Sequence, residues 1–307
     1  NIKQRNELPT ELENVEKITA FMECFPEVKC NPYDAQNGDA EPVELGLCVG
    51  RTAAAGVCFY PPGIPLIQAG EVYTGEIAEI IREGIQKNLE VIGIEKSERS
   101  ICFMPEIIFL MGKSATGKDH IYEQLAHDEQ LHLKRITMYT TRPMRAGEAE
   151  GVEYHFVNDD EAARLEKEGK IIEMRCYDTV IGVWKYFTVN DGQIQLGGKN
   201  RYIVIGTLEA YDGFCKYYGK EHLLPIYIEV EDKIRLLRAI HREEEQEKPK
   251  YAELCRRFLA DEQDFSEENL KKSGITKHFS NNDGLEDSVA AIKQEILRNI
   301  GEQKSRD

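Results

Sequence analysis

The sequence lacks any apolar run of the ~20 residues that a membrane-spanning helix requires. Its longest apolar stretches, residues 107–111 and 223–230, have the length of strands. It also lacks the charged-then-apolar start that is typical of an export signal, and its first residue, Asn1, is not a methionine. We therefore expect a cytoplasmic chain without a transmembrane helix, and we expect this sequence to be a piece of a longer or processed protein.

Basic residues are the scarcer charged class, with 39 Lys and Arg against 55 Asp and Glu and a formal net charge of −16. Non-specific binding to nucleic acid or anionic lipid requires clustered positive charge, so we expect neither partner. The eight cysteines include no Cys-x-x-Cys pair, which argues against a zinc site and favours free thiols. A hydrophobic content of 41% is enough for a core, and 307 residues favour two domains.

A change in composition near Met104 and Pro105 suggests where the domains divide. Proline disfavours helix in the residue before it, and the pattern of apolar residues changes at this point. We place the domains at residues 1–105 and 106–307. In the first domain, helical periodicity predicts helices over residues 9–22 and 74–88, the second beginning at Thr74 as N-cap. Its predicted apolar face consists of Ile77, Ile80, Ile81, Ile85 and Leu89.

In the second domain, apolar strand patterns alternate with glycine-rich turns and helical patterns. The predicted strands are residues 107–111, 202–205 and 224–230, and the predicted helices are 119–130, 231–244, 250–264 and 286–299. Alternation of this kind is typical of a parallel sheet with helices on both faces. We therefore predict an α/β fold with a P-loop NTPase-type parallel sheet, preceded by a small N-terminal α+β domain.

A glycine-rich motif directly follows the first of these strands. Residues 112–118 read G-x-x-x-x-G-K, a loop whose backbone N–H groups surround phosphate while the lysine reaches the β- and γ-phosphates. We predict that ATP binds here. Asp119 stands where a Ser or Thr usually binds Mg²⁺, so it is either a metal ligand or a favourable charge in the first helical turn. The predicted ATP-binding residues are Gly112, Lys113, Ser114, Ala115, Thr116, Gly117, Lys118 and Asp119.

A second anion-binding pattern lies downstream. Residues 140–148 read T-T-R-P-M-R-A-G-E, and residues 151–157 read G-V-E-Y-H-F-V. Two arginines three positions apart can hold phosphate oxygens with their planar guanidinium groups. The string resembles the nucleoside-monophosphate-binding segment of guanylate kinases, with Pro143 and Met144 in exchanged order. The resemblance extends from about residue 106 to 300 and implies a fold with lid and NMP-binding subdomains.

The resemblance implies phosphoryl transfer from ATP to GMP, assisted by Mg²⁺, and it assigns roles to single residues. Arg142, Arg145 and Tyr154 would hold the GMP phosphate, and Glu173 would accept hydrogen bonds from the guanine N1–H and 2-amino groups. The remaining assignments are Tyr186 and Thr188 as substrate contacts, Arg238, Arg242 and Arg257 as lid arginines, and Asn281 beside the adenine. Lys118, Arg142 and the lid arginines would be the catalytic residues, because they neutralise charge in the transition state.

Two departures concern the guanine pocket. Met138 replaces a serine of the family pattern, and Thr207 stands where the family has carboxylates, as a substrate contact without charge. Loss of a hydrogen bond in such a pocket costs ~1–3 kcal/mol, enough to alter selectivity. Two alternatives therefore stay open: a kinase-like module that binds a nucleotide without turnover, and a kinase for another phosphorylated acceptor such as a sugar bisphosphate.

The first hundred residues carry a separate resemblance. Residues 49–53 (V-G-R-T-A), 60–66 (Y-P-P-G-I-P-L) and 70–71 (G-E) are similar to the C-terminal domain of Orn/Lys/Arg decarboxylases, which use pyridoxal phosphate. No Ser-x-His-Lys context for the cofactor lysine is present, so these residues alone cannot decarboxylate. We expect a structural or docking remnant, or a regulatory module on a longer decarboxylase. A homo-oligomer and a missing N-terminal decarboxylase domain both stay open.

Overall fold

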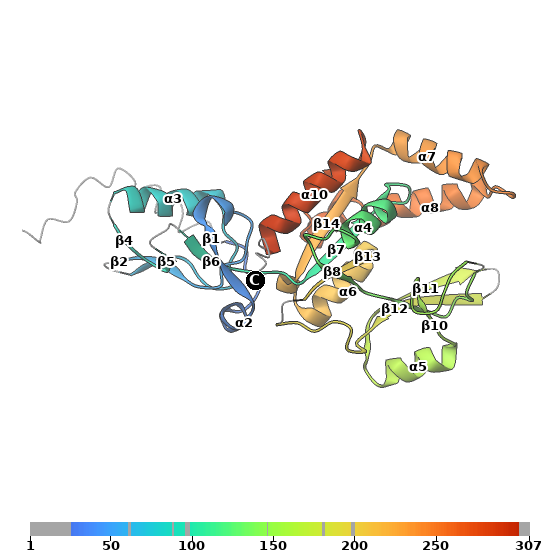
Figure 1. Cartoon of the computed structure of the whole chain (residues 1–307), viewed down its shortest axis with the longest axis horizontal. Helices are drawn as coiled ribbons and strands as arrows, with labels where there is room; N and C mark the ends of the chain where they lie inside the picture. Colours follow the sequence, from blue (N-terminus) through green and yellow to red (C-terminus); the bar gives the residue numbers. More distant parts are fainter. Residues whose placement is uncertain are drawn as a thin grey trace, which may run out of the picture. The chain divides into compact units, whose positions relative to one another are not determined.

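The computed structural model of the chain describes residues 26–60, 63–87, 89–95, 99–145, 147–179, 182–197 and 200–300. They separate into two compact units, one formed by residues up to 36 with 42–102 and the other by 37–41 with residues from 103 onward (Figure 1). The predicted division after residue 105 lies three positions beyond the end of the first unit. Among the described residues, no helix has the length and apolar character needed to cross a bilayer.

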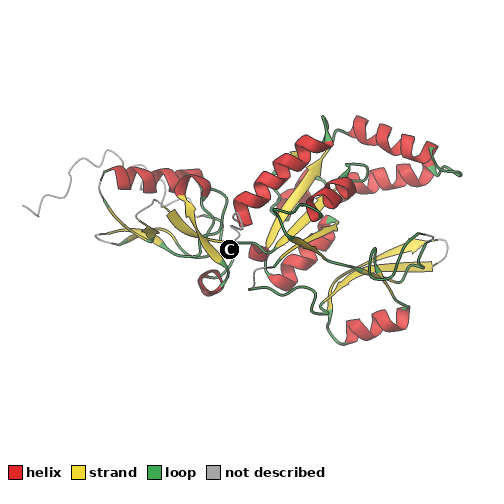
Figure 2. Cartoon of the chain, viewed as in Figure 1, coloured by secondary structure: helices red, strands yellow, loops and turns green. Residues whose placement is uncertain are grey.

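The first unit combines two small sheets with short helices, so it is an α+β unit as predicted (Figure 2). The strand orders are β1-β6-β5 and β3-β2-β4, and β2 pairs with both of its neighbours antiparallel. The elements are α2 (Pro32–Asn37), β1 (Ala40–Glu44), η1 (Leu45–Leu47), β2 (Val57–Tyr60), β3 (Ile64–Ile67), α3 (Gly75–Gln86), β4 (Glu90–Ile92), β5 (Ile94–Glu95) and β6 (Arg99–Phe103).

Helix α3 provides much of the core of this unit. The Thr74 hydroxyl accepts a hydrogen bond from the Ile77 N–H at 3.2 Å, which confirms the predicted N-cap. Ile77 and Ile81 are buried, whereas Leu89 is 41% exposed and lies beyond the end of the helix. The prediction that Leu89 belongs to the apolar face was therefore wrong. The helix predicted over residues 9–22 lies outside the described residues.

The second unit is organised around a five-stranded sheet in which every strand runs parallel to its neighbours. The order β15-β14-β7-β13-β8 places β7 at the centre, and residues 107–112 of this strand are all buried. The strands are β7 (Ile107–Gly112), β8 (Leu133–Arg135), β13 (Arg201–Gly206), β14 (Leu223–Glu229) and β15 (His278–Ser280). This arrangement confirms the predicted parallel sheet.

Successive residues of β7 point to opposite faces of the sheet, so its apolar side chains need covering on both faces, and helices provide this cover. Phe109 packs edge-to-face on Tyr211 and Phe214 of α6, whereas Ile108 belongs to the cluster formed with α4 and α10. Two apolar cores thus share one strand. The helical segments are α4 (Lys118–Ala126), α6 (Leu208–Tyr218), η2 (Lys220–His222), α7 (Asp232–Glu244), α8 (Tyr251–Asp264), α9 (Glu267–Lys272) and α10 (Leu285–Ile300).

A four-stranded sheet of order β10-β9-β12-β11 completes the second unit. Helix α5 packs on one face, where Leu165 and Phe187 belong to one buried cluster. The other face carries polar and aromatic side chains. The elements are β9 (Tyr139–Thr140), β10 (His155–Phe156), α5 (Asp159–Lys167), β11 (Ile171–Thr179) and β12 (Gly182–Val189).

Removing the aromatic ring at the centre of the second unit should destabilise it strongly. Phe109→Ala leaves a cavity beside two aromatic rings, and we expect a loss of about 3–5 kcal/mol in the free energy of unfolding. Leu259→Ala, at a side chain that is 69% exposed, serves as the control and should change stability little. Denaturant unfolding followed by circular dichroism measures both, and equal effects would contradict this description of the core.

Candidate functional site

The carboxyl ends of the five parallel strands share one edge of the sheet. The 112–118 loop follows β7, Thr207 follows β13, and Asn281 follows β15. Met138 comes three residues after the end of β8. Parallel pairing thus gathers at one edge residues that lie far apart in the sequence, and ligands of open α/β sheets bind at this edge.

The loop after β7 has the shape of a phosphate-binding loop. Gly117 has φ 84° and Ala115 has φ 61°, so both adopt the left-handed conformation. The Thr116 hydroxyl donates to the Lys113 carbonyl at 2.8 Å, and the buried Asn281 amide donates to the Thr116 carbonyl at 2.8 Å. A Cβ on Gly117 would come within 2.6 Å of the Asn281 amide nitrogen, so the loop requires glycine there. Asn281, which was predicted to lie beside adenine, thus supports the loop by a hydrogen bond to its backbone.

The two lysines of the loop have different surroundings. Lys113 Nζ forms an ion pair with Glu262 at 2.7 Å. Lys118, the first residue of α4, is half-buried and has no hydrogen bond or ion pair to any described residue. Its ammonium and the positive end of the helix dipole are therefore available to an anion. Asp119 is exposed in the first turn of the same helix.

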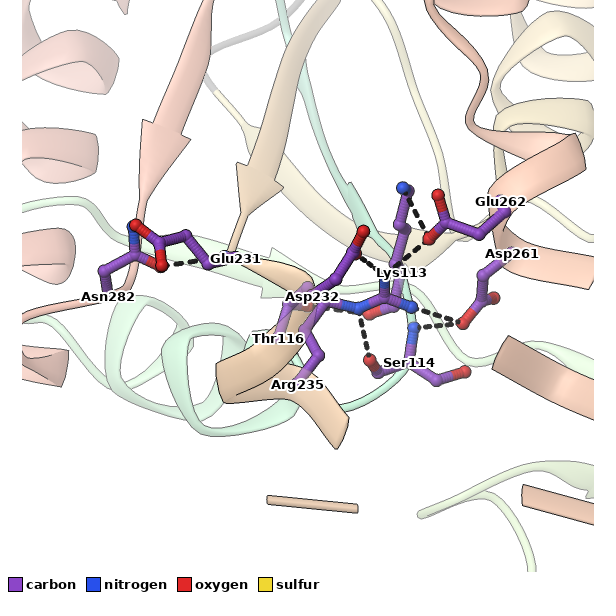
Figure 3. A network of polar contacts seen from close by, with 9 residues as sticks. All are labelled: Lys113, Ser114, Thr116, Glu231, Asp232, Arg235, Asp261, Glu262 and Asn282. Carbon is purple, nitrogen blue, oxygen red and sulfur yellow. Dashed lines mark hydrogen bonds and ion pairs between the residues drawn. The ribbon is translucent and has the colours of Figure 1, made fainter. Parts of the chain in front are cut away.

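A buried arginine that the sequence analysis did not select connects this loop to the lid helices. Figure 3 shows Arg235 of α7 between the loop and the acidic residues of α8. Its guanidinium donates to the Ser114 carbonyl at 3.2 Å, to Asp261 at 3.3 Å and to Glu262 at 2.8 Å. Asp261 also accepts the Ser114 N–H at 2.7 Å. Arg235 is 1% exposed, whereas the side chains of Asp261 and Glu262 are 16% and 35% exposed. The loop and helices α7 and α8 are therefore joined by ion pairs that are buried at the arginine and partly exposed at the carboxylates.

This network stabilises the ionised form of Glu262. Burial alone would raise the pKa of Glu262, but its hydrogen bonds to Lys113 and Arg235 lower it below its ordinary value. Arg235 also stacks on Phe258 of α8, with the guanidinium carbon 4.6 Å from the ring centroid. The base of the lid is therefore fixed by charge pairing and by packing.

The three predicted lid arginines differ in their contacts. Arg238 donates to the Asn281 carbonyl at 2.9 Å, next to the support of the phosphate loop. Arg257 is exposed and pairs with Glu253 at 2.9 Å, whereas Arg242 is exposed near the far end of α7. The pKa of Glu253 is lowered to about 2 by its hydrogen bonds to Arg256 and then Arg257. Arg242 and Arg257 remain predictions for a lid closed over a ligand.

The predicted acceptor-phosphate clamp has one buried and one exposed arginine. Arg142 is 4% exposed, and its two terminal nitrogens donate to Glu148 at 2.9 and 2.8 Å. Its guanidinium carbon lies 5.5 Å from the ring centroid of Tyr154. Arg145 is exposed and contacts Glu148 through its backbone: its N–H donates to the Glu148 carboxylate at 2.7 Å, and its carbonyl accepts the Glu148 N–H at 3.2 Å. Glu148 thus occupies the fork in which a phosphate is predicted to bind.

The polar face of the four-stranded sheet brings together most of the predicted acceptor residues. Glu173 pairs with Thr188 across β11 and β12, and the Thr188 hydroxyl donates to Glu173 Oε1 at 2.9 Å. Tyr186 lies edge-to-face on Tyr154, with ring centroids 5.7 Å apart. Burial raises the pKa of Tyr154, which therefore stays a neutral donor. The side chains around Arg142 and those around Glu173 are thus connected through Tyr154 and Tyr186.

Three residues of the site were missed or were assigned another role from sequence. Arg175, two positions after Glu173, donates to Glu173 Oε2 at 3.0 Å and is 9% exposed. Strand alternation could have identified it, because residues i and i+2 share a face. Thr207, predicted to contact substrate, is the N-cap of α6 and accepts the Ala210 N–H at 3.3 Å. Arg235 carried no local signal, since its partners come from distant segments.

These features define a P-loop α/β unit with a cluster of arginine, glutamate and tyrosine side chains on its four-stranded sheet. Comparison with known families matches residues 104–184 to guanylate kinase and residues 15–86 to the Orn/Lys/Arg decarboxylase C-terminal domain. The chain is therefore guanylate kinase-like in its second unit and decarboxylase-like in its first. Both resemblances expected from the motifs are confirmed.

Individual relatives cover limited parts of the chain. A guanylate kinase of Frankia casuarinae is 41% identical over 64 residues, which are 21% of this chain and 34% of that protein. An arginine decarboxylase of Halalkalibacterium halodurans is 35% identical over 78 residues, 25% of this chain and 16% of that protein. The crystal structure of guanylate kinase from Anaplasma phagocytophilum matches with a TM-score of 0.43 and 20% identity, over 66% of this chain and 88% of that chain.

Loss of the buried guanidinium of Arg235 should destabilise the second unit. Arg235→Met removes a buried cation, but Glu262 keeps its ion pair with Lys113, and the side chains of Asp261 and Glu262 are 16% and 35% exposed. We therefore expect a loss of about 1–3 kcal/mol in the free energy of unfolding. Arg164→Met removes an exposed arginine with two carboxylate partners and should change stability little. Denaturant unfolding of the two variants tests the difference, and equal losses would contradict the network.

The Arg142–Glu148 pair should give the protein a specific dependence on pH. The hydrogen bond from Arg142 lowers the pKa of Glu148 from 4.5 to about 2 in the folded protein. Because the folded value is the lower one, the stabilisation is present above about pH 4.5 and is lost as the pH falls toward 2. The stability difference between wild type and Glu148→Gln should therefore shrink over this range. The exposed-site control Glu129→Gln should give a difference that does not follow this titration.

Proposed function

We propose that the second unit catalyses phosphoryl transfer from ATP to the phosphate of GMP or of a related phosphorylated acceptor. The observation that carries this proposal is the pairing of two anion sites in one unit. One is the 112–118 loop with its available Lys118, and the other is the buried Arg142 beside Tyr154 and Tyr186. Two separate phosphate sites suit a reaction with two phosphorylated substrates, and the guanylate kinase match of residues 104–184 supports the same reaction.

The residues would act by positioning and by charge neutralisation. Lys118 and the loop N–H groups would bind the donor phosphates, while Arg142 and Arg145 would hold the acceptor phosphate. An acceptor phosphate oxygen forms the new bond to the γ-phosphorus, the bond to the bridging oxygen breaks, and ADP leaves with that electron pair. Arg238, Arg242 and Arg257 would offset the developing charge when the lid closes.

The loop also fits a magnesium nucleotide. Its left-handed Gly117 leads directly into the helix that begins at Lys118, an arrangement in which backbone N–H groups and the helix N-terminus bind phosphate. Asp119 is the carboxylate placed to hold Mg²⁺, which when bound would screen the phosphate charges. The described residues contain no group of three His, Cys, Asp or Glu side chains able to hold a metal, so Asp119 would share the ion with phosphate oxygens and water.

We propose a structural or docking role for the first unit, next to a decarboxylase domain. The match of residues 15–86 to the decarboxylase C-terminal domain supports this role. On this view the kinase-like unit could serve a longer decarboxylase as a nucleotide-binding or regulatory module. That alternative predicts that ATP binds without acceptor-dependent turnover.

Acceptor-dependent release of ADP should require both anion sites. With ATP, Mg²⁺ and GMP, we expect Lys118→Met to lower kcat by at least about 100-fold, because it removes a charge that acts in the transition state. Arg142→Met should chiefly raise KM for the acceptor. Lys167→Met, at an exposed position on α5, is the matched control.

A kinase and a nucleotide-binding module give opposite results in this assay. ADP release that depends on an acceptor and on Lys118 supports the kinase. If calorimetry shows ATP binding to the folded chain while no acceptor promotes ADP release, the second unit is a binding module and the proposed transfer is wrong.

A further inference from the structure

The pocket around Glu173 contains a charged group that the assigned roles do not use. Arg175 lies on β11, on the same face as Glu173 and directly opposite Tyr186 of β12. Its side chain is 8% exposed, and its Nε donates to Glu173 Oε2 at 3.0 Å. Burial lowers the pKa of Arg175, but the charge and hydrogen bond of Glu173 together with Tyr177 and Tyr154 raise it above its ordinary value, so the guanidinium stays ionised. The pocket therefore contains a permanent cation next to the carboxylate.

The terminal nitrogens of Arg175 have little to bind. One of them lies 3.7 Å from the Met138 sulfur, a weak acceptor, and among the described residues no oxygen accepts from either. A guanidinium carries five N–H donors, and no nitrogen of Arg175 is among the fully buried side-chain atoms without a partner, so the terminal nitrogens are within reach of solvent or of a ligand. Met138 stands at the ligand-binding edge of the parallel sheet, so these donors lie where that edge meets the four-stranded sheet. A ligand that supplies acceptor atoms would satisfy them.

The carboxylate of Glu173 is already engaged on both oxygens. Thr188 donates to Oε1 and Arg175 donates to Oε2, at 2.9 and 3.0 Å. The N1–H and 2-amino groups of guanine would have to share these oxygens and would bring donors close to the donors of Arg175. Donor facing donor is unfavourable in a desolvated pocket. The pocket is thus better suited to a ligand with an acceptor beside its N–H group.

We propose that Arg175 determines which phosphorylated substrate receives the phosphoryl group. It favours a substrate that directs a hydrogen-bond-accepting oxygen at the guanidinium over one that carries the 2-amino group of guanine. This inference rests on the proposed function and specifies its substrate class. The acceptor group is a ring carbonyl or the oxygen of a second phosphate, since both meet the same N–H donors. The clamp at Arg142 would hold the common phosphate in either case.

Three nucleotides that differ at one ring position test the carbonyl form. GMP carries an amino group at position 2, XMP carries a carbonyl there, and IMP carries hydrogen. For the full chain with ATP we expect kcat/KM for XMP to exceed that for GMP by at least about 10-fold, with IMP between them. A pentose bisphosphate tests the second-phosphate form, and a higher kcat/KM for it than for XMP would assign the acceptor group to phosphate.

Variants at position 175 connect this preference to the guanidinium. Arg175→Met should reduce the ratio of kcat/KM for XMP to kcat/KM for GMP by at least about 10-fold. Arg175→Lys, which retains charge and donors, should partly restore this ratio. The double change Glu173→Gln with Arg175→Gln avoids an unpaired buried carboxylate if the single variant fails to fold. Arg142→Met, in contrast, should lower kcat/KM for all three nucleotide monophosphates without changing their order of preference.

Equilibrium binding separates failure of this inference from failure of the proposed function. If no acceptor turns over, titration calorimetry of XMP and GMP with wild type and Arg175→Met still measures the preference. Tighter binding of XMP that is lost in the variant supports the role of Arg175, even for a protein that only binds. A wild-type preference for GMP, or any preference that Arg175→Met leaves unchanged, overturns it.

Discussion

Parallel pairing around β7 is the constraint on which the site depends. Because the five strands run in one direction, the segments that follow them meet at a single edge. The central strand is buried on both faces, so its register cannot shift without exposing apolar side chains. A Cβ on Gly112 would come within 2.7 Å of the Ile228 carbonyl, so the last residue of β7 must be small. The phosphate loop is therefore presented at a defined place beside the ends of β13 and β15.

Buried guanidinium groups organise the rest of the site. Arg142, Arg175 and Arg235 are each less than a tenth exposed, and each is paired with a carboxylate. The cost of leaving a buried charge unpaired is high, so each pair restrains the segments that it joins. Arg235 joins the 112–118 loop to helix α8, Arg142 is paired with Glu148 at the proposed acceptor-phosphate site, and Arg175 is paired with Glu173 where we propose that it determines specificity.

Much of the architecture could be predicted because it depends on local patterns. Strands β7, β13 and β14 were predicted to within one residue at each end, because buried parallel strands appear in the sequence as apolar runs. The helix predicted over 119–130 ends at Ala126, and the four-stranded sheet was not predicted. Two of its strands, β9 and β10, have only two residues each, which is too short for any periodicity to be recognised.

The sequence by itself determined the order of the two anion-binding motifs, the strand–loop–helix unit around residues 112–118, and the division into a decarboxylase-like and a kinase-like part. Only the tertiary structure decided which arginines are buried and what they contact. Lys113 and Glu262 are 149 residues apart, yet their charged atoms lie 2.7 Å apart. Pairing of this kind depends on the distance between folded segments, and the energy of a charge depends on its burial, so neither quantity is contained in a local pattern of residues.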